Sequence, residues 1–401
     1  MHASFLFNAG LILAGLALAG LLFHRLRQSV IPAFILLGMA LRPQVTDVHL
    51  VQVLSTLGVV LLLFFMGLEF SLGALLRGRR RILRNGGIDL LVCFPPGLLA
   101  GLALGWGWAG GLLLGGALYI SSSAIIAKSV IELRRAANPE TEVALGVLVF
   151  EDLFAAVFLA VVSGAVLAAD PSAMTAAGGV GTALLFFAVV VLLALRARPL
   201  LNRVFDVGSD DLFVLTVAGV VLLLAWAALA AGLSEAIGAF LAGLMLAETH
   251  HKARAEALFA PLQGLFAAVF FLGFGLSLDV AAFARIWPYA LSLALIGVAL
   301  KLAAGWWIGR RDGLGPRNAL ALGLMLIARG EFSIIIAGIA AAAGLTELSA
   351  LIALLVLLLA LFGTMGMQFA PHLSRWLFPR RPERTLAERG FSPELATFSD
   401  G

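Results

Sequence analysis

The chain consists of long apolar runs separated by short segments that are rich in charged residues. Several runs contain no Asp, Glu, Lys or Arg over about twenty residues or more, which is the length that crosses the hydrocarbon core of a bilayer as a helix. These runs cover residues 3–23, 50–68, 212–234, 257–278 and 348–374. The pattern predicts an all-α polytopic membrane protein.

We predict about thirteen transmembrane helices from the apolar periodicity and the breaks between runs. Their approximate bounds are 4–23, 29–42, 50–70, 87–106, 110–134, 141–168, 178–196, 211–231, 233–248, 256–279, 284–308, 317–342 and 347–372. Clusters of glycine interrupt chains, and on that ground two of the breaks are placed at "GWGWAGG" and at Ala231-Gly232.

The basic residues support this threading, because most of the 27 Lys and Arg residues fall on one side of the predicted membrane. Cytoplasmic loops collect Lys and Arg. The sequence therefore predicts an external N-terminus and a cytoplasmic C-terminus in a bacterial inner membrane. Residues 1–375 are expected to form the transmembrane domain, and residues 376–401 a short basic cytoplasmic tail.

Composition agrees with a chain embedded in lipid and narrows the classes of function. Hydrophobic residues make up 62% and charged residues 12% of the chain, whereas about 25% of an ordinary soluble domain is charged. The net charge of +4 comes from loops, so it indicates topology rather than nucleic-acid binding. The sequence contains no nucleotide, metal or nucleophile motif, so we expect neither an enzyme nor a cofactor.

Ionisable residues nevertheless occur deep inside predicted spans. Each costs at least about 2.5–3.5 kcal/mol at the centre of a bilayer, so such residues usually face a protein interior or a water-filled cavity and mark function. We assign six residues to this group: Lys128, Glu151, Asp152, Lys301, Arg329 and Glu331.

Two predicted helices are interrupted by small, polar or charged residues at mid-depth, in "LYISSSAIIAKSV" and in "GLMLIARGEFSIIIAG". They are seven spans apart and so run in opposite directions, as in transporters built from inverted repeats with discontinuous helices. Ser121, Ser122 and Ser123 would then line the crossing. Lys128, Arg329 and Glu331 would compensate the half-helix dipoles. The alternative is that the serines and glycines only allow close helix packing.

Two adjacent carboxylates lie in the otherwise apolar stretch "VFEDLF". Glu151 and Asp152 project about 100° apart around a helix, so one can face the crossing while the other faces a neighbouring helix. Lys301 is the expected counter-charge, and the cluster would titrate as a coupled set. A carboxylate that binds either a proton or a cation would suffice for exchange. The alternative is an inert buried salt bridge between Glu151 and Lys301, which leaves Asp152 unpaired.

At these residues the sequence resembles the cation:proton antiporter-2 superfamily, particularly its Kef-type branch. The resemblance rests on "LLLFFMGLEFSLGAL", "ISSSAIIAKSVIEL", "VLVFEDLFA", "LSEAIGAFLAGLMLAET", "FFLGFGLSLD" and "ARGEFSIII", in the order and spacing of that family. It implies that Asp152 binds the ion and carries the proton, that Glu151 lies at the neighbouring variable position, and that Lys301 is the membrane lysine that pairs with Glu151.

The resemblance also implies a fold and partners. We expect core helices at about 87–168 and 284–372, with the remaining helices forming a dimerisation scaffold, and an elevator-like movement between them. A homodimer in membrane lipid is expected, with any regulation supplied by a separate cytoplasmic subunit. Glu69 and Glu235 are candidates to line a funnel that concentrates cations.

The expected activity is exchange of K⁺ or Na⁺ for protons by alternating access. The ions carried are the only small molecules the site is expected to need. Two other classes stay open: a gated cation channel, and a sodium-coupled symporter of an organic solute on the same fold. The sequence contains no repeated "TVGYG"-type filter, and it has fewer mid-depth polar residues than an organic solute would require.

Overall fold

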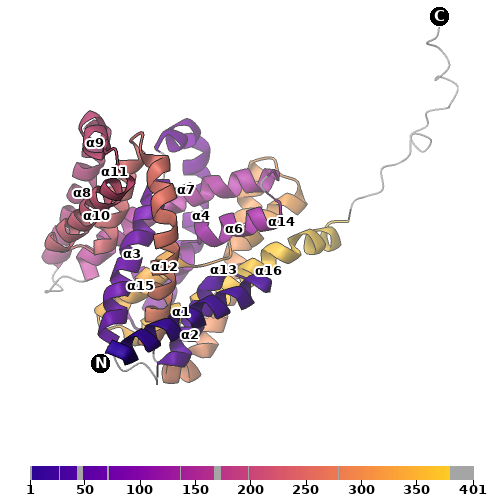
Figure 1. Cartoon of the computed structure of the whole chain (residues 1–401). Helices are drawn as coiled ribbons and strands as arrows, with labels where there is room; N and C mark the ends of the chain where they lie inside the picture. Colours follow the sequence, from indigo (N-terminus) through magenta and orange to yellow (C-terminus); the bar gives the residue numbers. More distant parts are fainter. Residues whose placement is uncertain are drawn as a thin grey trace, which may run out of the picture.

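Helices make up the whole secondary structure of the described chain. The computed structural model describes the chain apart from residues 1, 27, 43–47, 70–71, 136, 167–172, 197, 279 and 380–401. Within the described part there are sixteen helices and no strand, which confirms the predicted all-α class (Figure 1). Most of the predicted tail lies outside the described residues.

The first nine helices precede a polar turn near residue 207. They are α1 (His2–Arg25), α2 (Val30–Leu41), α3 (Val48–Glu69), α4 (Leu72–Ala103), α5 (Gly107–Tyr119), α6 (Ser123–Glu132), α7 (Pro139–Val166), α8 (Ala173–Arg196) and α9 (Arg198–Phe205).

The other seven helices complete the bundle. They are α10 (Asp210–Ala230), α11 (Glu235–Ala247), α12 (Lys252–Ser277), α13 (Val280–Arg311), α14 (Pro316–Met325), α15 (Glu331–Ala342) and α16 (Thr346–Leu377). In Figure 1, α8, α9 and α10 lie towards the left, and α13, α14 and α16 towards the right.

The described helices fit a multi-pass membrane protein, although the predicted number of thirteen spans is not confirmed. Seven helices are long and apolar enough to cross a membrane, or eight if the bent pair formed by α8 and α9 is one span, and further apolar helices are shorter. Two segments predicted as basic loops are helical instead, because α4 already begins at Leu72 and α9 covers Arg198–Phe205. Long basic side chains can extend from a helix to water, so the basic residues in these two segments did not mark the ends of helices.

Glycines in the left-handed backbone region form the two breaks that were predicted from glycine clusters. Gly105 (φ 85°) and Gly107 (φ 63°) separate α4 from α5, and Gly232 (φ 76°) separates α10 from α11. Residues with a Cβ rarely adopt this conformation, so the chain turns here without strain.

Both predicted helix interruptions are present. Residues 120–122 separate α5 from α6, and residues 326–330 separate α14 from α15. The two non-helical segments meet directly, since the backbone N–H of Ser122 donates to the carbonyl oxygen of Ala328 at 2.9 Å. The crossing of two discontinuous helices is therefore confirmed.

The helices pack in two groups whose members contact one another extensively. In the first group, α3 packs against α11 and α12, and α12 against α2. The backbones of α3 and α11 touch, because a Cβ on Gly67 would lie 1.9 Å from the carbonyl oxygen of Phe240. The second group contains α4, α5, α7 and α13 to α16. Assigning a moving core and a fixed scaffold to these groups stays a prediction.

Candidate functional site

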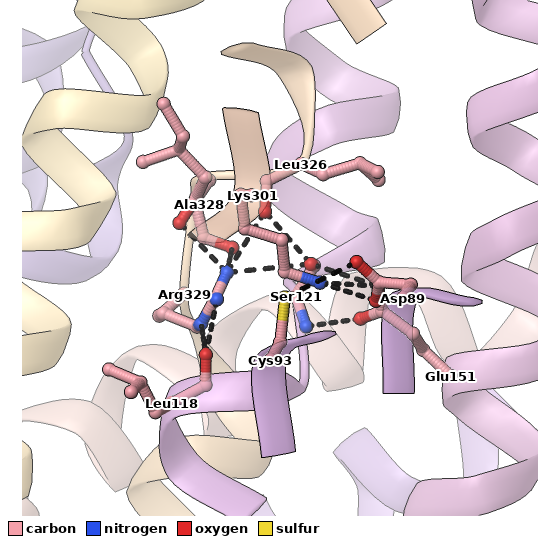
Figure 2. Close-up of polar contacts among 10 residues, drawn as sticks. Asp89, Cys93, Leu118, Ser121, Glu151, Lys301, Leu326, Ala328 and Arg329 are labelled. Carbon is pink, nitrogen blue, oxygen red and sulfur yellow. Dashed lines mark hydrogen bonds and ion pairs between the residues drawn. The ribbon is translucent and has the colours of Figure 1, made fainter. Parts of the chain in front are cut away.

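The guanidinium of Arg329 binds the carbonyl ends of two half-helices. It is fully buried and donates to the carbonyl oxygens of Leu118 at 3.1 Å, near the end of α5, and of Leu326 at 2.9 Å, just after α14. Carbonyl groups at a helix C-terminus lack partners within the helix and carry partial negative charge. Arg329 therefore supplies both hydrogen bonds and a compensating charge where the two helices break (Figure 2).

Glu331, two residues after Arg329, lies at the positive end of a helix dipole, whereas Arg329 binds the negative ends. It is the first residue of α15, so its carboxylate lies at the partially positive end of that helix. Its Oε2 accepts a hydrogen bond from the hydroxyl of Ser122 at 2.8 Å, and Ser122 is also the N-cap of α6. Its Oε1 is buried and has no hydrogen-bond partner within the described chain.

Lys301 lies between two buried carboxylates at the centre of the cluster (Figure 2). Its Nζ is 3.0 Å from Oε1 of Glu151 on α7 and 2.6 Å from Oδ2 of Asp89 on α4. None of the three side chains is exposed. The ammonium also lies 5.1 Å from the ring centroid of Tyr119. The expected pair of Glu151 and Lys301 is present, as part of a larger group.

Asp89 is the residue that the sequence analysis missed, so its set of six deep ionisable residues was incomplete. Asp89 is inside the predicted span 87–106, but near its start, where a carboxylate would reach the membrane surface. In the structure α4 begins at Leu72 and runs for 32 residues, so Asp89 lies near the middle of the helix. The signal was a carboxylate between "NGG" and the apolar run "LLVCF".

Ser121 lies between Arg329 and the group formed by Asp89, Glu151 and Lys301, and it contacts both carboxylate oxygens of Glu151. The backbone N–H of Ser121 donates to Oε2 of Glu151, and its Oγ lies 3.1 Å from Oε1. The same Oγ is 3.4 Å from Nη1 of Arg329. Both oxygens of Glu151 therefore have partners from the protein itself.

Asp152 has a different environment although it is the next residue. Its side chain is half-buried, and its Oδ1 accepts a long hydrogen bond from the hydroxyl of Ser123 at 3.4 Å. Among the residues that the structure describes, no Lys or Arg lies within ion-pair distance of Asp152. This carboxylate retains most of its capacity to bind a proton or a cation.

A cavity of about 240 Å³ approaches this side of the site between α2, α3 and α12 on one wall and α6 and α15 on the other. Ser123 and Glu331 line it at the crossing, and Glu69 and Lys128, both on exposed positions, line it further out. Since Ser123 also donates a hydrogen bond to Asp152, the side chain of Ser123 lies between the cavity and that carboxylate. Glu235 is half-buried at the first turn of α11 and is not in this lining.

Two discontinuous helices that cross beside buried charges in a helical membrane protein define a class, that of secondary transporters with inverted repeats. The chain belongs to the transmembrane sodium/hydrogen exchanger family, whose model matches residues 12–372. The resemblance to the cation:proton antiporter-2 superfamily is thereby confirmed.

Curated relatives and a solved structure agree with this family. The K⁺/H⁺ antiporter subunit KhtU of Bacillus subtilis is 36% identical over 351 residues, which cover 85% of this chain and 87% of the relative. The ammonium/H⁺ antiporter subunit AmhT of Alkalihalophilus pseudofirmus is 33% identical over 393 residues, or 96% and 97% of the two chains. The sodium proton antiporter MjNhaP1 of Methanocaldococcus jannaschii shares the fold, with a TM-score of 0.69, 14% identity and coverage of 95% and 100%.

Proposed function

We propose that this protein is a secondary-active antiporter that exchanges a monovalent cation, K⁺ or Na⁺, for protons by alternating access. One observation carries the proposal. Of two adjacent carboxylates, Glu151 has protein partners on both oxygens, while Asp152 has one long hydrogen bond and lies beside a cavity. Asp152 is the carboxylate that would bind the cation and the proton in turn.

Exchange follows from competition for this one carboxylate. A proton on Asp152 removes the negative charge that a cation needs, and a bound cation disfavours the proton. A half-buried carboxylate without a counter-charge is unfavourable, so holding one of the two ions stabilises the site. The hydroxyl of Ser123 would complete the coordination of the cation, as an oxygen ligand already 3.4 Å from Asp152.

Other features of the transporter belong to the same proposal. A homodimer in the bacterial inner membrane, an external N-terminus and an elevator-like movement of the core are expected from the family resemblance. The names of KhtU and AmhT as antiporter subunits support a separate regulatory subunit. The name of KhtU also favours K⁺ as the first cation to test.

The test uses the full chain in proteoliposomes that contain a pH dye and carry a fixed proton gradient. Adding K⁺, Na⁺ or Li⁺ should raise the internal pH in the wild type. We expect Asp152→Asn to abolish this response. Asp210→Asn is the matched control, because Asp210 lies on α10 and binds Arg254 at 2.7 Å, away from the crossing.

The alternative functions give different results in the same vesicles. A channel would conduct cations with no obligatory proton movement, and would continue to conduct after Asp152→Asn. A symporter would show proton-independent uptake of an organic solute driven by Na⁺. Absence of cation-dependent proton flux from correctly reconstituted wild-type protein would contradict the proposed antiport.

A further inference from the structure

The position of Lys301 between two carboxylates bears on how many protons move in each cycle. A buried lysine that is paired with a single carboxylate becomes an uncompensated charge when that carboxylate is neutralised, and buried lysines lose their protons readily. Lys301 has two partners, from two different helices. Its Nζ is closer to Asp89 of α4, at 2.6 Å, than to Glu151 of α7, at 3.0 Å.

Asp89 has a contact on its own helix in addition to its ion pair with Lys301. The thiol of Cys93, one turn along α4, lies 3.5 Å from its Oδ1, and Oδ2 receives the ammonium. Neither Asp89 nor Lys301 has exposed side-chain surface. The contact between α4 and α13 is therefore a fully buried ion pair.

Two of the three buried carboxylates of the site, Asp89 and Glu151, have cationic partners that do not involve Asp152, while the third, Glu331, lies at the start of α15. The carboxylates of Asp89 and Glu151 are matched by the ammonium of Lys301, and by Arg329, which reaches Glu151 through Ser121. A buried carboxylate that is paired with a cation avoids the large cost of an uncompensated charge. Asp152 is not one of these paired carboxylates, so one ion is enough to neutralise it.

We propose that Asp89 is the permanent partner of Lys301 and keeps this lysine charged and in place throughout the transport cycle, so that Asp152 alone exchanges and one proton moves for each cation. Asp89 is a positioning residue, because it acts through Lys301 and does not touch the transported ion. As one K⁺ binds to Asp152 one proton leaves it, and no other group changes its charge. The inference rests on the proposed antiport.

The test measures stoichiometry in proteoliposomes with the membrane potential clamped to zero. For one proton per K⁺, net proton flux stops when the K⁺ gradient equals the proton gradient. For two protons, it stops when the K⁺ gradient equals the square of the proton gradient. In the wild type we expect the K⁺ gradient at zero flux to equal the proton gradient. In Asp89→Asn, where Lys301 keeps Glu151 as its single carboxylate, we expect the K⁺ gradient at zero flux to shift towards the square of the proton gradient.

A double variant and a control separate this role from a structural one. Asp89→Asn combined with Lys301→Met removes one charge of each sign. This double variant should again reach zero flux when the K⁺ and proton gradients are equal, which damage to the fold alone would not produce. The control is Asn85→Ala, one turn from Asp89 on α4, which loses a hydrogen bond to Asp312 of 2.9 Å and should stay at equality.

Three results would overturn the inference. The first is a squared ratio in the wild type, which needs no variant. The second is equality in a folded Asp89→Asn protein. The third is absence of proton flux that depends on K⁺ or Na⁺ in the wild type, which refutes the proposed antiport as well and is recognised because the flux is then zero at every cation gradient.

Discussion

The regions around Glu151 and Asp152 differ although the two residues are adjacent. Glu151 is fully buried, and each of its carboxylate oxygens is bonded to Ser121 or Lys301. Around Asp152 the protein is partly open, and the carboxylate has a single long bond to Ser123. A rotation of about 100° per residue separates them. Consecutive positions of one helix can therefore hold one carboxylate whose oxygens are both bonded to the protein and one that is largely free to bind an ion.

The largest expected effect comes from breaking the network of buried hydrogen bonds and ion pairs at Arg329. Arg329→Gln leaves buried carbonyl oxygens of α5 and α14 without their charged donor. Each unsatisfied buried group costs about 1–3 kcal/mol, so we expect the two groups together to cost at least about 2 kcal/mol of stability and to leave little folded protein. Size-exclusion chromatography and thermal unfolding in detergent measure it. Normal unfolding of Arg329→Gln would show that the crossing is stabilised in another way.

A smaller effect is expected when the network loses Glu151. Glu151→Gln keeps an acceptor for the N–H of Ser121 but removes one ionic partner of Lys301, which retains Asp89. A hydrogen bond to a charged group contributes about 1.5–3 kcal/mol, so we expect a loss of about 2 kcal/mol in thermal unfolding, with exchange preserved. A folded Glu151→Gln protein that is as inactive as Asp152→Asn would remove the distinction between the two carboxylates.

The smallest effect is expected on the open side, at Ser123. Ser123→Ala removes the long hydrogen bond to Asp152 and one oxygen ligand for the cation. A typical hydrogen bond contributes about 0.5–1.5 kcal/mol, so the K⁺ concentration for half-maximal exchange should rise by about two- to twelvefold while thermal unfolding stays unchanged. Ser123→Thr, which keeps the hydroxyl, is the matched control. An equal rise in both variants would indicate a steric effect instead.

The crossing could be predicted from sequence because it is a local exception in an apolar background. Serines at 121–123 and the charged pair Arg329 and Glu331 stand out within their helices, and the breaks in the structure occur at these residues. Glycine clusters predicted the positions of two other breaks, because they too stand out from the apolar residues around them. Each of these signals lies within a few residues of the feature it produces.

The partner of Lys301 could not be predicted completely because it depends on where a long helix begins. The basic segment before residue 87 suggested a loop, which put Asp89 at the membrane surface. In the structure α4 continues through that segment, and Asp89 meets Lys301 across 212 residues of sequence. The different surroundings of Glu151 and Asp152 likewise follow from packing with α5 and α6, which their adjacent positions do not reveal.

The length of α4 and α13 has a consequence for the lipid around the protein. Each has 32 residues and is therefore about 48 Å long, whereas the hydrocarbon core of a bilayer is about 30 Å thick. Only 33% and 39% of their most apolar stretches are buried within the described chain, and a helix longer than the hydrocarbon core is accommodated by tilting. They carry Asp89 and Lys301, so a change in bilayer thickness acts directly on the two helices that hold the central ion pair together.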